Sequence, residues 1–358
     1  MPRYLGTPDI PADDSERIGV LLVNSGTPDS ARVRDIRRFL GRLLGDPRVV
    51  ELPRWLWLPI LHGIILPLRP LRSARKYREM LSAGRSPLRE LSGSLRADLE
   101  QALESQADTP IAVAAGMLYS SPSVRRALHD LIERGARRLL VVPLFPQYCG
   151  VTTGAVIDEV GRVLGALRVA PEVRFVTDYH DDAGYIEALR ASIAAHWAAN
   201  GRTGHLLLSW HGIPSAYCDK GDPYHKRCHA TAQLLADALG LHDGEWSVAF
   251  QSRFGGGRWL RPYTGEVLES LPARGVHTAT VACPGFAIDC LETLQEIEVE
   301  DRARFLRAGG TRLDYVPALN ARPVHVQALA QLVAAHTRGW AGRAVTRPGA
   351  FPRVVSLG

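Results

Sequence analysis

The feature that most constrains the fold is a regular alternation of short apolar runs with amphipathic stretches, which the chain goes through twice. Each apolar run is typical of a strand that is buried on both faces of a parallel sheet. The predicted strands are residues 18–24, 111–117, 138–145 and 173–178 in the first round, and 205–210, 247–251, 278–282 and 313–317 in the second.

Helical patterns follow most of these runs. They cover residues 32–44, 124–134 and 154–167 in the first round, and 226–239, 291–308 and 324–336 in the second. Strand followed by helix predicts parallel strands joined by helical crossovers. We therefore expect an α/β protein of two similar, doubly wound, Rossmann-like domains, with a ligand cleft between them at the carboxyl ends of the strands.

The same pattern predicts the domain boundaries. We expect an N-terminal tail at 1–16, a first domain at 17–182, a second domain at 183–338 and a mobile tail at 339–358. The most hydrophobic run, residues 55–68, is 14 residues long and contains two prolines, whereas a helix that spans a bilayer needs about 20 residues. We expect it to belong to an apolar lip near 53–84 that touches a membrane peripherally without crossing it.

Composition excludes several classes of partner and site. The formal net charge is +6, but the basic side chains are almost all Arg and lie scattered among acids, so we expect no nucleic-acid partner. The first fifteen residues lack the apolar core of a secretory signal, and the five cysteines match no C-x-x-C zinc pattern. The sequence also has no phosphate-binding loop and no G-x-S-x-G turn. We expect a cytoplasmic protein with free thiols and no nucleotide site.

Two strand ends of the second round carry the candidate chemistry. His211 directly follows one buried strand, and residues 283–292 lead from the end of another strand to Glu292. A single histidine at a strand end is more often structural than catalytic. Because parallel strands end at one edge of their sheet, however, this imidazole and this carboxylate can share a pocket.

Glu292, Glu296 and Glu300 recur every four residues and would form an acidic stripe on one helix face. The plainer interpretation is a solvated charged face. Like charges at this spacing destabilise a helix, however, and no basic side chain of the same helix is spaced to offset them before Arg304. A bound cation would compensate, and carboxylates with one imidazole suit Fe²⁺, Mn²⁺ or Mg²⁺.

Aromatic side chains near the same strand ends offer walls for a large flat ligand. They are Tyr148, Trp259 and Phe286. Trp259 alone fits hinge packing at least as well. Together with the neighbouring glycines at 255–257, Trp259 indicates a narrow binding site for a planar ring.

Several short motifs follow one another along the chain. In the first half they are LVNSGTP at 22–28, DPRVV at 46–50, GRSPL at 84–88, PLFPQY at 143–148 and TTG at 152–154. In the second half they are HGIP at 211–214, DKGDPY at 219–224, QSRFG at 251–255 and the segment 283–297. Through these motifs the chain resembles the ferrochelatase family over residues 18–336. The family's fold, that of class II chelatases, has two Rossmann-like domains around a porphyrin cleft.

The resemblance implies a lyase that inserts ferrous iron into protoporphyrin IX, giving protohaem and two protons in the last step of haem synthesis. His211 lines up with the family's cleft histidine, which takes pyrrole protons or binds the metal, and Glu292 with the facing carboxylate. Glu296 and Glu300 line up with an acidic path for the metal. Ser25, Tyr148, Trp259 and Phe286 line up with the porphyrin walls.

The resemblance also bears on cofactors and assembly. Fe²⁺ is expected as a substrate, and a monomer is expected. Some relatives hold an iron-sulfur cluster through additional cysteines, notably in a C-terminal extension. Because no cysteine follows Cys290 in this chain, we expect no such cluster.

Two positions depart from the family pattern and keep alternatives open. Ser25 stands where relatives usually carry a larger apolar or aromatic side chain in the porphyrin roof, and Leu118 stands where many carry an Arg. A porphyrin- or haem-binding protein without turnover is therefore one alternative. The same chemistry on coproporphyrin III is another.

Overall fold

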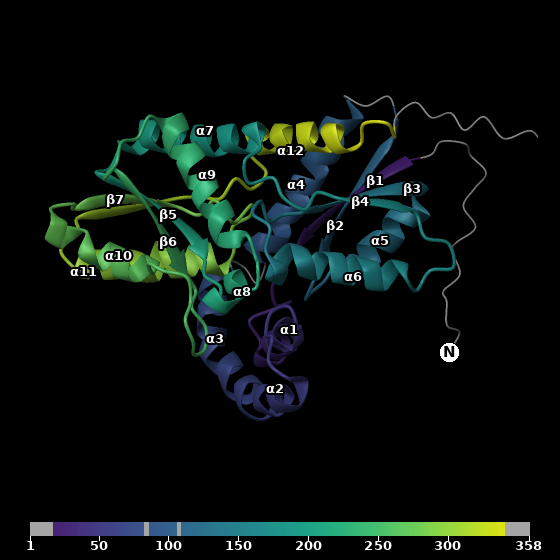
Figure 1. The fold of residues 1–358 in the computed structure, drawn as a ribbon, viewed down its shortest axis with the longest axis horizontal. Helices are drawn as coiled ribbons and strands as arrows, with labels where there is room; N and C mark the ends of the chain where they lie inside the picture. Colours follow the sequence, from purple (N-terminus) through teal and green to yellow (C-terminus); the bar gives the residue numbers. More distant parts are fainter. Residues whose placement is uncertain (1–16, 82–85, 106–108, 341–358) are drawn as a thin grey trace, which may run out of the picture.

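The computed structural model describes residues 17–81, 86–105 and 109–340 (Figure 1). The predicted tail at 1–16, part of the predicted lip at 82–85 and most of the predicted tail at 339–358 lie outside the described residues. Trp340, within the predicted tail, is buried, and its indole Nε1 donates to Glu172 at 2.8 Å.

The first sheet has four parallel strands in the order β2-β1-β3-β4. Its strands are β1 (Arg17–Asn24), β2 (Ile111–Met117), β3 (Ala136–Pro143) and β4 (Glu172–Phe175). Ile18 lies between Ile111 on one side and Arg138 on the other. The two central strands are almost wholly buried, as their continuous apolar sequence predicts.

The second sheet repeats this arrangement in the order β6-β5-β7-β8. Its strands are β5 (His205–His211), β6 (Trp246–Gln251), β7 (Thr278–Ala282) and β8 (Arg312–Val316). Every pairing is parallel. The predicted α/β fold with two parallel sheets is confirmed, and all eight predicted strands are present within a few residues of the expected bounds.

Helices cover the two sheets and connect them. In the first half they are α1 (Val33–Gly45), α2 (Arg54–Ile60), the π-helix η1 (Leu61–Ile65), α3 (Leu66–Met80), α4 (Pro87–Glu104), α5 (Val124–Glu133), the π-helix η2 (Gly150–Gly154) and α6 (Ala155–Leu164). In the second half they are α7 (Ala183–Asn200), α8 (Ser215–Asp219), α9 (Tyr224–Leu239), α10 (Thr264–Ser270), the 3₁₀ turn η3 (Pro272–Arg274), the π-helix η4 (Glu292–Asp301), α11 (Arg302–Arg307) and α12 (Pro323–His336).

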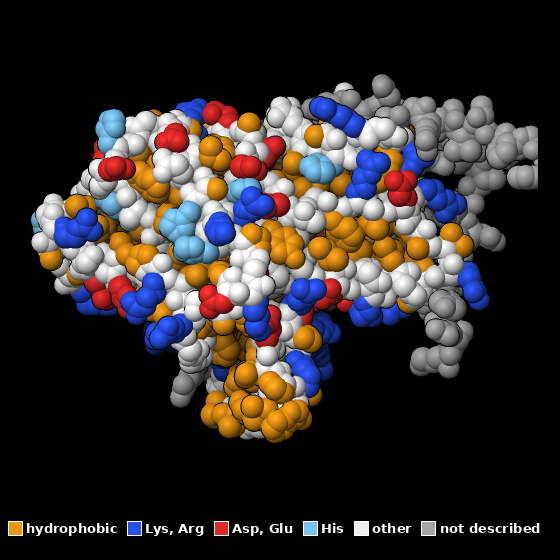
Figure 2. Space-filling model, in the orientation of Figure 1, with side chains coloured by type: hydrophobic (Ala, Val, Ile, Leu, Met, Phe, Trp, Pro, Cys, Tyr) orange, Lys and Arg blue, Asp and Glu red, His pale blue; other side chains and the backbone are white. Residues whose placement is uncertain are grey.

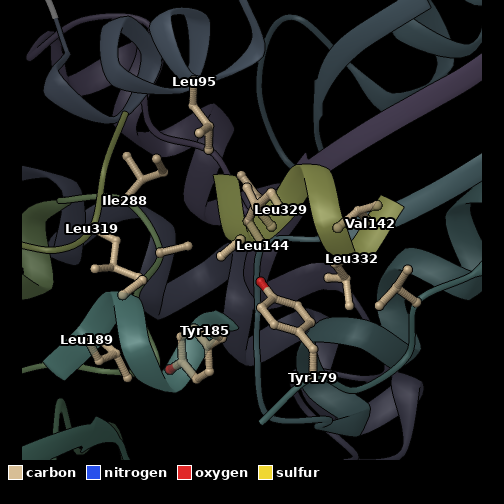
Figure 3. Close-up of a cluster of buried hydrophobic side chains, with 14 of the residues drawn as sticks. Leu95, Val142, Leu144, Tyr179, Tyr185, Leu189, Ile288, Leu319, Leu329 and Leu332 are labelled. Atoms are coloured by element: carbon tan, nitrogen blue, oxygen red, sulfur yellow. The ribbon is translucent and has the colours of Figure 1, made fainter. Parts of the chain in front are cut away.

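A single core cluster joins the two halves. Figure 3 shows Val142 of β3 close to Leu329 and Leu332 of α12, and the same cluster includes Leu208 of β5. Helix α12 packs on both α4 and α7. The two sheets therefore share one large core, while the other face of each sheet packs on a cluster of its own, around Leu128 in the first half and Phe305 in the second.

Helices α2, η1 and the start of α3 form the projecting apolar tip in Figure 2. Trp55 is 79% exposed, and Ile64 and Leu68 are also exposed. Leu61 and Trp57 turn inward and pack with Phe39 of α1. One side of the tip therefore packs against the rest of the protein, and the other side exposes apolar side chains to solvent. Within the described part of the chain, no helix is long and apolar enough to span a bilayer.

Candidate functional site

His211 ends the buried strand β5 and its ring is fixed in orientation. The ring Nδ1 lies 2.7 Å from the carbonyl oxygen of Gly212. Because a carbonyl oxygen only accepts, Nδ1 carries the proton in the neutral ring and Nε2 keeps its lone pair. The hydroxyl of buried Tyr224 donates to the main-chain oxygen of His211 at 3.0 Å. The strand end is thus held while Nε2 is left to take a proton or a metal ion.

Glu296 is held by both donors of one serine. Ser252 follows β6, and its N–H and hydroxyl donate to the two Glu296 oxygens at 2.8 and 2.6 Å. Burial raises the pKa of Glu296, while the Ser252 hydrogen bonds and nearby His211 oppose that rise and Glu292 adds to it. Glu296 thus lies within electrostatic reach of both His211 and Glu292.

The start of η4 is tied to the strand ends of the second sheet. Buried Gln251 donates from Nε2 to the main-chain oxygen of Glu292 at 2.7 Å. The Gln251 Oε1 in turn accepts from Ser209 of β5 at 2.6 Å. One turn earlier, the carboxylate of buried Asp289 accepts from Thr293 and Tyr315 at 2.9 and 2.5 Å. The backbone that carries Glu292 is therefore anchored on both sides.

Helix η4 differs from the expected α-helix. Residues Glu292–Asp301 form a π-helix of 10 residues, and an α-helix begins only at Arg302. Such helices are rare, and they are frequent at functional sites. Nothing in the apolar pattern distinguishes i→i+5 from i→i+4 hydrogen bonds, so the sequence did not predict it. The acidic side chains nevertheless lie on the segment that the spacing indicated.

The charge of the acidic stripe is offset partly by another helix, which the sequence could not indicate. Lys76 of α3 lies 2.6 Å from Glu300. Arg69 of α3 lies near Glu292, and its guanidinium stacks 4.0 Å from the ring centroid of Phe254. Burial lowers the pKa of Arg69. A bound cation is therefore not needed to compensate the charge of Glu300, because Lys76 of α3 already does so.

The predicted wall residues also lie near the carboxyl ends of strands, in different surroundings. A Cβ at Gly212 would lie 3.5 Å from the Trp259 ring, so this indole packs against Gly212, the residue after His211. Tyr148 lies near Arg48 in the loop after β3. Phe286 packs on the core below η4 and lines a small cavity with Leu189 of α7.

Ser25 lies just beyond the end of β1. Its N–H donates to the side chain of Asn24 at 2.7 Å, and its carbonyl oxygen accepts from Tyr119 at 3.0 Å. Leu118 occupies the matching position after β2 and packs against the apolar cluster that contains Phe39, Trp57 and Leu61. These contacts fix the backbone on which the predicted porphyrin roof would be built.

Sequence reasoning assigned no role to four residues that the structure places at this site. Gln251 and Ser252 lie in the QSRFG run, which was used only as a family motif. Arg69 and Lys76 lie on α3, which is distant from η4 in the sequence and reaches it only through the fold. The available signal was the position of residues 251–252 directly after a buried strand.

Comparisons with known proteins show the family of the chain. The profile of the ferrochelatase family matches residues 17–337. A ferrochelatase of Nitrosococcus oceani is 47% identical over 94% of this chain and 92% of its own length. One of Thioalkalivibrio sulfidiphilus is 46% identical with the same coverage.

The chain belongs to the ferrochelatase family. It is a metal chelatase, a lyase that inserts a metal ion into a porphyrin, with iron as the metal substrate. Among solved structures, Bacillus subtilis SirB with Fe³⁺ has a TM-score of 0.52 at 13% identity, and the match covers 89% of this chain and 94% of that one. That similarity supports the class II chelatase fold of this ferrochelatase.

Proposed function

We propose that this ferrochelatase inserts Fe²⁺ into protoporphyrin IX to give protohaem, with His211 and Glu292 at the reacting centre. The observation that carries the proposal is the free Nε2 of His211 at the end of β5, within electrostatic reach of the Glu296 carboxylate, one turn of η4 from Glu292. A neutral imidazole and a carboxylate supply the two kinds of base that the reaction needs.

The chemistry requires two N–H protons to leave as the metal enters. In this proposal His211 accepts a pyrrole proton at Nε2, since Nδ1 already donates to Gly212. Glu292 accepts the second proton or holds the metal from the opposite side. Trp259 beside Gly212 provides a rigid wall against which the macrocycle bends, which exposes its nitrogen lone pairs. Phe286, Tyr148 and Ser25 complete the predicted porphyrin walls.

The sparse set of ligands suits a metal that passes through. Among the described residues, no group of three or more His, Cys, Asp or Glu side chains could hold a metal ion. The porphyrin nitrogens would therefore supply the remaining ligands, and iron would be transferred to them instead of staying on the protein. Glu296 and Glu300 serve in this proposal as the path toward Glu292.

The choice of porphyrin is tested directly by competition. Protoporphyrin IX and coproporphyrin III are offered together to the anaerobic enzyme with limiting Fe²⁺, and the two metallated products are separated and quantified. We expect the iron to appear in protoporphyrin. Preferential metallation of coproporphyrin III would overturn the substrate assignment, and tight binding of either porphyrin without metallation would instead indicate a carrier.

We also infer that the apolar tip meets a membrane, from which a poorly soluble porphyrin could enter. The support is the bare surface around Trp55 and Ile64, which contrasts with their inward-facing neighbours. Changing both residues to Ser should weaken flotation with phosphatidylglycerol-containing vesicles about tenfold or more. Val169→Ser, which removes a comparably exposed side chain outside the tip, is the control. Equal flotation of all three proteins would rule out this contact.

A further inference from the structure

Helix α3 contacts η4 through two polar pairs that face each other. The Lys76 ammonium lies 2.6 Å from Glu300, and Gln295 Nε2 donates to Glu79 at 3.2 Å. Lys76 and Glu79 are three residues apart and share one face of an α-helix. Gln295 and Glu300 are five residues apart, which is the hydrogen-bond spacing of a π-helix. The contact is therefore between two matched helix faces.

The ion pair sits where a cation can reach it from solvent. The Lys76 side chain is 47% exposed and that of Glu300 is 32% exposed. Glu296, one turn earlier, is held by Ser252. Exposed ion pairs are weak and exchange readily. Of the last two carboxylates of the stripe, Glu300 is thus the one whose partner a solvated cation can replace.

The partner of Glu300 is a lysine, which a cation can replace more easily than an arginine. Of the 43 basic Lys and Arg residues of the chain, only Lys76, Lys220 and Lys226 are Lys. A guanidinium can bind a carboxylate through two parallel hydrogen bonds, whereas an ammonium acts as a single point charge. Lys76 therefore neutralises Glu300 without the bidentate grip that Arg would give.

We propose that Lys76 is a counter-ion gate: a divalent cation entering the acidic path displaces its ammonium from Glu300. This inference rests on the proposed role of Glu300 in the metal path. The Gln295–Glu79 hydrogen bond still joins α3 to η4, so the displacement exchanges the counter-ion of Glu300 without separating the two helices.

The lysines themselves provide the first test. The wild-type chain is treated briefly with an amine-acetylating reagent, with and without Zn²⁺, and the modification of each Lys is quantified by peptide mass spectrometry. We expect Zn²⁺ to raise acetylation of Lys76 about two- to fivefold. Lys220, which pairs with Glu51, and Lys226 serve as internal controls and should not change.

Two results of that measurement would overturn the gate. One is Lys76 acetylation that stays constant across the Zn²⁺ titration. The other is an equal rise at Lys76 and Lys220, or an equal rise with KCl at the same ionic strength, because either shows general screening. The measurement needs no porphyrin, so it remains informative if the proposed substrate is wrong.

A kinetic test asks whether the Lys76 ammonium competes with Fe²⁺ for Glu300. Lys76→Gln removes the competing ammonium, so KM for Fe²⁺ should fall about two- to fivefold while KM for the porphyrin stays the same. Lys226→Gln removes the same charge on α9 and is the matched control. A KM for Fe²⁺ that stays constant or rises in Lys76→Gln would overturn the gate while leaving iron insertion by the wild type intact.

Discussion

Ser252 shows how much of this site depends on one backbone conformation. Its φ is 64°, in the left-handed region that residues other than glycine rarely adopt. In this conformation its N–H and hydroxyl both point at Glu296. The local cost of the conformation is offset by two hydrogen bonds to a charged group, which are stronger than neutral ones.

Ser252→Ala should therefore impair the use of Fe²⁺ and change its pH dependence. Loss of the hydroxyl removes one of the interactions that hold down the pKa of Glu296 against burial. The carboxylate would then be protonated at a higher pH, so the acidic limb of kcat/KM for Fe²⁺ should move upward and the value at neutral pH should fall about tenfold. Ser270→Ala on exposed α10 is the control. An unmoved pH profile would contradict this role.

At the scale of the element, η4 carries the carboxylates of the acidic stripe and ends in a buried acid. Asp301 is the last residue of the π-helix, and its side chain is 3% exposed with Arg304 3.3 Å away. Burial, reinforced by Glu296, raises the pKa of Asp301 from 3.8 to about 7. This acid is harder to ionise in the folded chain than in the unfolded chain.

That shift predicts a stability difference with a definite sign. Between about pH 4 and pH 7 the folded state binds more protons at Asp301 than the unfolded state does, so this group lowers the free energy of unfolding as pH rises. Asp301→Asn should remove this decrease. Relative to wild type, the free energy of unfolding of the variant should therefore be roughly 1–3 kcal/mol higher at pH 8 than at pH 4. Urea unfolding at both pH values, beside Glu104→Gln on the surface of α4, measures it. If the free energies of unfolding of wild type and Asp301→Asn change with pH in parallel, the raised pKa of Asp301 is refuted.

The same element marks the limit of prediction from sequence. The four-residue spacing of Glu292, Glu296 and Glu300 located the helix, but side-chain spacing alone does not determine whether the backbone closes i→i+4 or i→i+5. The partners Lys76 and Ser252 come from segments that are distant in sequence. Only the tertiary fold brings them to η4, so no local pattern could reveal them.

At the scale of the whole molecule, the shared core predicts that the two halves unfold together. Leu329 of α12 is 2% exposed and lies among side chains from both halves (Figure 3). Leu329→Ala should lower the free energy of unfolding by about 2–5 kcal/mol in a single transition. Val324→Ala, on an exposed position of the same helix, should change it by less than about 0.5 kcal/mol. Two separate transitions would contradict a shared core.

The sheets were predictable because their strands are continuous apolar runs with clear ends. The segments that went unpredicted have weaker patterns. Helix α7, for example, carries alanines on several faces, and α3 contains Pro70 within a basic stretch. Their positions are decided by packing, since α7 contacts α12 and α3 contacts η4. The proposed site residues His211 and Glu292 could be selected from the sequence because ligands in such a fold bind at the carboxyl ends of the strands.

The central claim, that His211 and Glu292 carry out iron insertion, is tested most directly in one anaerobic measurement. Wild type, His211→Ala and Glu292→Gln are incubated with Fe²⁺ and protoporphyrin IX, and porphyrin binding and loss of porphyrin fluorescence are followed in the same samples. We predict that all three proteins bind the porphyrin and that insertion falls about a hundredfold or more in each variant. Insertion at the wild-type rate by either variant would contradict the claim.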